Sequence, residues 1–174
     1  DSGGVSINGI ESAVVKDTAF GPTADDIAVI LSGSGGGRTL ASNDGGSTWF
    51  TIDSRGGSSI DWWFAADGTS TWILAGSGGA GDILSALQVS PGNPLTSSSS
   101  ATQLANTSAA QLGLGEEEDT NRFASAIVGI PDTDSAFVGT TKTEEATSIG
   151  TLRKVTLSAG DPITATISET GLTG

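Results

Sequence analysis

Three residue types that carry much of enzyme chemistry are missing from this 174-residue chain, which has no cysteine, no histidine and no tyrosine. Without cysteine there is no disulfide, thiolate nucleophile or thiolate metal site, and this composition fits a secreted microbial protein. Without histidine the chain lacks the commonest general base and transition-metal ligand, so a Ser–His–Asp triad is impossible within it. We therefore expect a protein that is not an enzyme by itself and has no bound cofactor.

Positive charge is also scarce, with seven Lys and Arg against twenty Asp and Glu and a net charge of −13. Such a surface repels phosphate backbones and anionic lipid, so nucleic acid and membrane insertion are not expected. The acidity fits either a salty environment or bound divalent cations, calcium among them, and composition leaves both interpretations open. The chain starts at Asp1 with no signal peptide, which predicts a processed or trimmed polypeptide.

Small residues are abundant instead, and they follow a repeated pattern. Gly alone accounts for 26 residues, which favours short strands joined by tight turns over long helices. Each of three copies has an apolar strand, a turn, a second apolar strand that closes on a small residue and Gly, and a third strand. The first strands are expected around Phe20, at Trp62–Phe64 and at Ala126–Ile130, and the second at Ile27–Gly33, Thr71–Gly76 and Ser135–Gly139. The third strands are centred on Leu40, Leu84 and Leu152.

These copies predict one all-β domain over residues 1–174, built from about three β-propeller-like blades, each a four-stranded antiparallel sheet. The units span about 14–53, 54–96 and 122–168, and Gly4 to Ile10 adds a strand before the first. Leu87–Thr96 matches Val155–Thr164 as strand, turn and strand. The Ser/Thr/Glu-rich residues 97–121 are expected to form an inserted surface loop, with one helical turn near Ala109–Leu112. Closed propellers have four to eight blades, so we expect part of a larger propeller or an assembly of copies.

The most specific motif is Ser42-Asn43-Asp44-Gly45-Gly46-Ser47-Thr48-Trp49. Ser42 and Asp44 have short polar side chains that accept hydrogen bonds from turn N–H groups. The glycines permit a positive φ. Trp49 is expected to begin the next strand and to bury a large apolar surface. The motif therefore predicts a self-fastened hairpin turn.

This string resembles the Asp-box, or BNR repeat, of pattern Ser-x-Asp-x-Gly-x-Thr-Trp, and Ser42, Asp44, Gly46, Thr48 and Trp49 fill its defined positions. Such boxes occur in sialidases, other glycoside hydrolases and sortilin-type receptors. The resemblance implies a four-stranded propeller blade with the box between its third and fourth strands, in a structural role away from catalytic centres. The other two copies lack the Asp and Trp, so the resemblance is complete for one box.

Few residues of the chain are candidates for a catalytic or ligand-binding role. A sialidase resembling this pattern needs a Tyr nucleophile, which is absent, and an Arg cluster, for which the chain has Arg38, Arg55, Arg122 and Arg153. Another glycosidase needs two carboxylates, for which the candidates are Asp61, Asp67, Asp132 and Asp134, although each also suits a turn. Trp62 and Trp63 are candidates for stacking on a sugar, with core packing as the alternative.

Two weaker sites complete the set. Asp132 and Asp134 offer alternate oxygens to a cation such as calcium but lack the Gly and distal Glu of an EF-hand loop. Asn106 lies in an N-glycosylation sequon, and the acidic run Glu116–Asp119 is either a solvated face or a cation site.

The sequence favours a non-catalytic extracellular or cell-surface module with a structural or recognition role, such as a surface-layer, sheath or filament component. Its partners would be copies of itself, other surface proteins or carbohydrate. The alternative is a fragment of a carbohydrate-active enzyme whose catalytic residues lie elsewhere.

Overall fold

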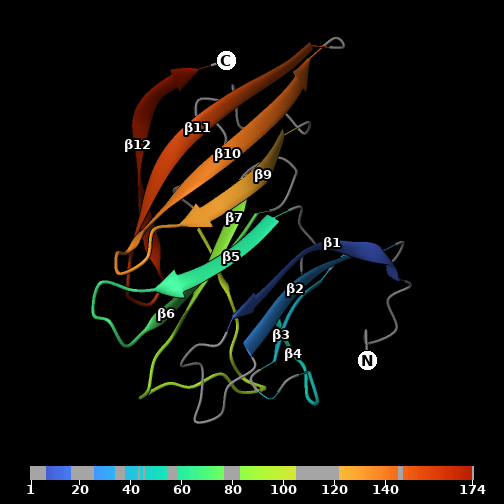
Figure 1. Cartoon of the computed structure of the whole chain (residues 1–174), viewed down its shortest axis with the longest axis vertical. Helices are drawn as coiled ribbons and strands as arrows, with labels where there is room; N and C mark the ends of the chain where they lie inside the picture. Colours follow the sequence, from blue (N-terminus) through green and yellow to red (C-terminus); the bar gives the residue numbers. More distant parts are fainter. Residues whose placement is uncertain are drawn as a thin grey trace.

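The protein is all-β, with three antiparallel sheets of four strands each (Figure 1). The computed structural model describes residues 7–16, 26–33, 38–42, 44, 46–54, 59–76, 83–104, 122–144 and 147–173, and these ranges contain no helix. The first sheet comprises β1 (Ile7–Lys16), β2 (Asp26–Gly33), β3 (Arg38–Ser42) and β4 (Phe50–Asp53). The second comprises β5 (Ser59–Phe64), β6 (Thr71–Gly76), β7 (Leu84–Val89) and β8 (Thr102–Gln103). The third comprises β9 (Arg122–Gly129), β10 (Ser135–Glu144), β11 (Thr147–Ser158) and β12 (Thr164–Thr173).

Within each sheet the strands follow chain order, so every sheet is a meander of neighbouring antiparallel strands. The first strands of the three sheets also meet. In Figure 1, β5 lies between β1 and β9 and contacts both. The sheets are therefore stacked in series as blade-like units, with the second sheet in the middle.

Two apolar clusters hold this stack together, one on each face of the second sheet. On one face, Trp63, Trp72 and Leu74 pack with residues of the third sheet such as Val138 and Val155. The other face packs against Ala41 and Ile52 of the first sheet, and its members are Ile60, Trp62, Ile73, Ala75, Leu87 and Val89. All six residues of β6 are buried, which explains why its sequence is apolar without alternation.

The predicted second and third strands are confirmed, because β2, β6 and β10 cover the former and Leu40, Leu84 and Leu152 lie in β3, β7 and β11. The first sheet differs at its start. Its first strand is β1 at Ile7–Lys16 rather than a strand around Phe20, which lies outside the described residues. The stretch predicted as an extra strand therefore contributes residues 7–10 to the first sheet itself. The third sheet likewise continues to Thr173, beyond 168.

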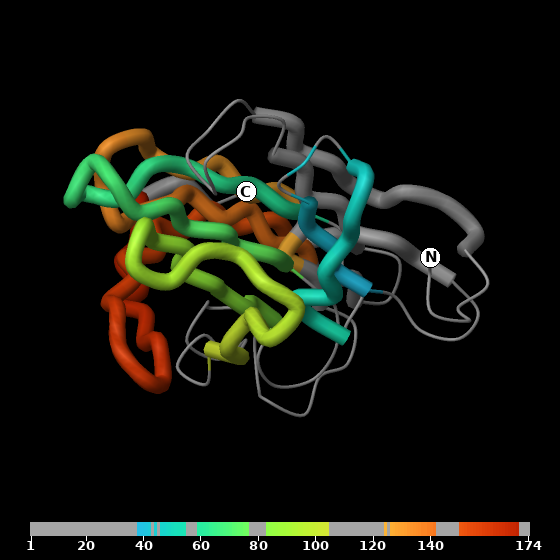
Figure 2. The backbone as a smooth tube through the Cα atoms, turned by 90° about the horizontal axis from the view of Figure 1, so that it is seen from below, coloured from blue at the N-terminus to red at the C-terminus, as the bar shows by residue number. Residues whose placement is uncertain are grey.

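The second sheet takes its fourth strand from the predicted insertion. Leu95-Thr96 was expected to start that strand, but Thr96 begins a turn in which Ser99 N–H donates to its carbonyl at 3.0 Å. The hydroxyls of Thr96 and Ser98 also lie 2.9 Å apart, as expected where Ser and Thr side chains compete with strand pairing. The chain makes a long excursion (yellow-green in Figure 2) before β8 pairs with β7 and Leu104 becomes fully buried. Residues 105–121, with the predicted helical turn, lie outside the described residues.

Candidate functional site

The motif turn lies between β3 and β4 and is fastened by two side chains. Asp44 Oδ1 accepts the N–H of Thr48 at 2.8 Å, and Asp44 Oδ2 accepts the Thr48 hydroxyl at 2.6 Å. Ser42 Oγ donates to Asp44 Oδ1 at 2.8 Å and accepts the N–H of Gly46 at 2.9 Å. These bonds, led by those from Thr48, lower the pKa of Asp44 below its ordinary value. Every polar group of the Asp44 side chain is thus used to hold the turn.

Gly46 and Trp49 complete the motif in different ways. Gly46 has a φ of 85°, the left-handed region that glycine adopts without a steric penalty. Trp49 precedes β4 and is half-buried, and it is not a member of either apolar cluster. Trp49, expected to begin the strand and to bury a large apolar surface, lies one residue before β4, whereas Ile52, 2% exposed, is the core residue of that strand.

Asp67 closes the turn between β5 and β6 with side-chain hydrogen bonds, as Asp44 does between β3 and β4. Asp67 Oδ1 accepts the N–H groups of Thr69 at 2.8 Å and Ser70 at 2.7 Å, while Oδ2 accepts the Ser70 hydroxyl at 2.6 Å. The pKa of Asp67 falls to about 2 because these donors, first the Ser70 hydroxyl, favour the carboxylate. Gly68 has a φ of 68° at the tip of this turn. Asp67, a candidate glycosidase carboxylate, is therefore engaged in the same way as Asp44.

Asp134 joins the second and third sheets rather than closing its own turn. Its Oδ1 accepts the indole N–H of Trp72 at 2.8 Å and the N–H of Ala66 at 3.2 Å. Beside it, the indole N–H of Trp63 donates to the Thr133 carbonyl at 2.8 Å. Two tryptophans of the second sheet are thereby bonded to the turn between β9 and β10.

Asp61 and Gly129 form the next contact along this junction. Asp61 Oδ2 accepts the N–H of Gly129 at 2.8 Å, which links β5 to β9. Gly129 lies against the ring of Trp63, and a Cβ built on it would be 2.2 Å from a ring carbon. Only glycine permits this approach, so position 129 and Trp63 are matched to each other.

The candidate catalytic groups are dispersed over these structural roles. Asp61, Asp67 and Asp134 accept hydrogen bonds in three different contacts, whereas Asp132 is an exposed turn residue with a φ of 59°. Trp62 and Trp63 are 0% and 3% exposed, so neither ring face is available to stack on a sugar. The sequence interpretation missed Trp72 and Gly129, whose roles depend on a contact between sheets. The apolar context of Trp72 and the Gly at a strand end were the only local signals.

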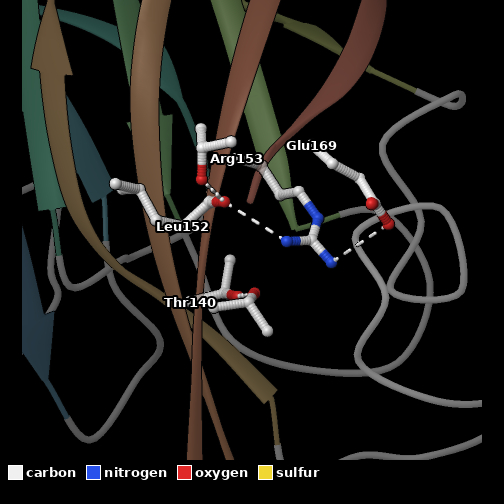
Figure 3. A network of polar contacts seen from close by, with 6 residues as sticks. Thr140, Leu152, Arg153 and Glu169 are labelled. Atoms are coloured by element: carbon white, nitrogen blue, oxygen red, sulfur yellow. Dashed lines mark hydrogen bonds and ion pairs between the residues drawn. The ribbon is translucent and has the colours of Figure 1, made fainter. Parts of the chain in front are cut away.

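The arginines do not form the cluster that a sialidase would need within the described chain. Arg153 is buried in the third sheet, where its Nη1 donates to the Leu152 carbonyl at 3.2 Å (Figure 3). Its Nη2 lies 3.9 Å from Oε1 of the exposed Glu169, a separation and exposure at which an ion pair contributes little. Arg38 lies in the first sheet, the side chain of Arg122 is not described, and Arg55 lies outside the described residues.

The remaining candidate sites can be placed only in part. Over the described strands and turns, no three acidic side chains gather as ligands for a metal ion, and Asp132 and Asp134 form no such group. The sequon residue Asn106 and the acidic run at 116–119 lie outside the described residues. Nor does the described part of the chain contain a helix that is long and apolar enough to cross a membrane.

The side chains described above therefore form two turns closed by aspartate hydrogen bonds and a contact between the second and third sheets that contains Trp63 and Trp72. Comparison with protein-family models gives no match to this chain. Comparisons with curated proteins and with solved structures give none either. The resemblance to Asp-box proteins accordingly rests on the motif residues Ser42 to Trp49 and on the place of their turn between the third and fourth strands of a sheet.

Proposed function

We propose that this chain is a non-catalytic, β-propeller-like module that acts in surface structure or recognition outside the cell. The observation that carries the proposal is the structural use of four acidic side chains in the described part of the chain. Asp44 and Asp67 hold turns, and Asp61 and Asp134 hold the junction between sheets. A carboxylate that acts as acid, base or nucleophile must instead face a substrate.

The chain's composition supports the extracellular part of the proposal. A chain with no cysteine and a net charge of −13 stays soluble at high concentration and is indifferent to the redox state of its surroundings. The stacked sheets supply a rigid body on which loops can present binding residues. Carbohydrate remains a recognition partner in this proposal, contacted by loops rather than by Trp62 or Trp63.

Two measurements test the proposed function. In the cells that produce the protein, surface-directed protease or a membrane-impermeant label should reach it without lysis. The purified chain should release no sugar from a panel of polysaccharides and sialosides, with Asp134→Asn as a matched variant. Protection until lysis would contradict the location. Hydrolysis by the chain that is lost in a carboxylate variant would favour the alternative, a carbohydrate-active enzyme.

A further inference from the structure

One face of the third sheet is turned away from the second sheet and carries exposed apolar side chains. Val128 of β9 and Phe137 of β10 are paired across the two strands and are 59% and 38% exposed. They are the large hydrophobic side chains that the described part of the chain leaves exposed. Ala136 and Val138, on either side of Phe137, are buried against the second sheet, so Phe137 and Val128 lie on the opposite face. We call that face of the third sheet the open face.

The repeat shows which positions these two exposed residues occupy. In the second sheet, the N–H of Ala65 donates to the carbonyl of Ser70 at 2.8 Å and closes the turn between β5 and β6. In the third sheet, the N–H of Ile130 donates to the carbonyl of Ser135 at 2.9 Å and closes the corresponding turn. The two turns therefore give a common origin from which to compare the strands.

Counting two residues outward from each bond gives the pair Trp63 and Trp72 in the second sheet and the pair Val128 and Phe137 in the third. The two tryptophans are 3% and 1% exposed because the third sheet covers them. The open face therefore carries its large side chains at the position through which the second sheet packs onto its neighbour. An exposed apolar face at such a position is typical of a surface that binds another protein.

A hollow lies beside this exposed pair on the open face. The next pair on the same face of β9 and β10 is Ala126 and Gly139, which are exposed and half-buried. A Cβ built on Gly139 would lie 3.4 Å from the Cβ of Ala126, and among the described residues beyond its chain neighbours only Ala126 has atoms within 4 Å of it. The open face therefore has a ridge, formed by Val128 and Phe137, next to a hollow, formed by Ala126 and Gly139.

We propose that two copies of this chain pack their open faces against each other about a twofold axis. An axis that lies between the faces, runs across the strands and passes between ridge and hollow places each ridge over the hollow of the other copy. Val128 then faces Ala126 of the second copy and Phe137 faces its Gly139, and the same contacts occur in reverse. One patch, whose exposure is described, thus supplies both sides of the contact. This inference deepens the proposed structural role and rests on it.

The charges on the open face permit contact between two copies. Lys154, paired with Phe137, is the one ionisable side chain in the ridge and hollow rows of β9, β10 and β11. The twofold axis places it over Leu152 of the second copy, which is paired with Gly139, so the two lysines do not face each other. Each copy carries a net charge of −13, but this repulsion acts at long range and is screened by salt. Association should therefore strengthen as ionic strength rises.

The size of the open face sets the expected strength of the contact. Its four strands lie about 4.8 Å apart and its side-chain rows from Ser135 to Thr141 about 6.8 Å apart, which gives a face of about 500 Å². Two copies would bury about 1,000 Å², the lower end of specific interfaces, so we expect a dissociation constant in the micromolar range.

Sedimentation equilibrium of the 174-residue chain at micromolar concentrations tests the proposal, and the expected mass is that of two chains. Val128→Lys should raise the dissociation constant on the order of 30-fold, because it removes half of the ridge and places an unpaired charge in the contact. Ala66→Lys, at an exposed turn outside the open face, is the matched control and should leave the dissociation constant unchanged. Both variants make the chain less negative, so weaker association cannot come from overall repulsion.

A compensating charge tests the twofold geometry. Because Val128 faces Ala126 of the second copy, adding Ala126→Glu to Val128→Lys places a carboxylate opposite each new ammonium group. This double variant should dimerise about tenfold more tightly than Val128→Lys alone. Val128→Lys combined with Ala66→Glu has the same net charge and should recover nothing.

Four results would overturn the proposal: a monomer at every concentration and salt level, equal effects of the two single lysine variants, no recovery by Ala126→Glu, or an open-ended assembly. Val128→Thr keeps the β-branched shape and guards against a variant that fails to fold, and it should weaken the dimer without changing the circular dichroism spectrum. Enzymatic hydrolysis by a dimeric chain would refute the non-catalytic role and leave the contact intact. A monomer without activity would refute only the contact.

Discussion

The bond between Asp134 and Trp72 offers the sharpest test of how the second and third sheets are joined. Asp134→Ala removes the acceptor of the Trp72 indole N–H, whose side chain is almost fully buried. Hydrogen bonds to charged groups contribute about 1.5–3 kcal/mol, and water can replace the second bond, because Ala66 is exposed. We therefore expect the free energy of unfolding to fall by about 2–3 kcal/mol. For a domain of this size that corresponds to a melting temperature lower by about 4–12 °C.

Asp134→Asn is the control for this prediction, because its amide oxygen still accepts from Trp72 while the charge is lost. Its free energy of unfolding should fall by less than half as much as that of the Ala variant. Urea titration followed by tryptophan fluorescence and by circular dichroism measures both variants, and agreement between the two signals checks that unfolding is two-state. If the Ala and Asn variants were equally stable, or if Ala matched the parent, the hydrogen bond would not hold the junction.

Two further predictions concern the same junction and the turn beside it. Gly129→Ala should destabilise the protein by about 1–3 kcal/mol or more, since its Cβ would overlap the Trp63 ring, whereas Gly92→Ala, with no atom within 4 Å of its Cβ, should cost little in a thermal melt. The pKa of Asp67 is lowered to about 2 from 3.8, so its stabilising effect is complete above pH 4 and is lost as the pH falls towards 2. The difference in free energy of unfolding between the parent and Asp67→Asn should therefore shrink as the pH falls from 4 towards 2. A constant difference would show that the hydrogen bonds of Asp67 do not stabilise the turn.

The sequence correctly predicted the strands and turns that form through interactions between residues close together in the chain. Leu40, Leu84 and Leu152 mark third strands correctly, because apolar residues between turn signals fix both the strand and its ends. The turn at Ser42 to Trp49 was also predicted correctly, since Ser, Asp, Gly and Thr at these spacings form hydrogen bonds with one another across four residues. Such contacts need no information from elsewhere in the chain.

Errors arose where two local tendencies competed. Leu95-Thr96 matched Ile163-Thr164 in pattern, yet only the latter leads directly into a strand. In the second sheet the hydroxyls that follow Leu95 form a turn first, and pairing resumes at β8. Beside these, the motif placed Trp49 correctly at the start of the fourth strand to within one residue, but it did not indicate that Ile52 is the core residue of β4.

The sequence by itself determined that the protein is all-β, that it repeats a four-stranded unit, and where the hydrogen-bonded turn between β3 and β4 lies, because periodicity and short-range bonding are local properties. Only the tertiary structure decided which aspartate closes its own turn and which one holds a neighbouring sheet. Asp67 and Asp134 occupy similar turns in the sequence, but the latter meets the indole of Trp72 because stacking brings two sheets within hydrogen-bond distance. The exposure of Val128 and Phe137 is decided in the same way, since whether a face is covered depends on which sheet lies next to it.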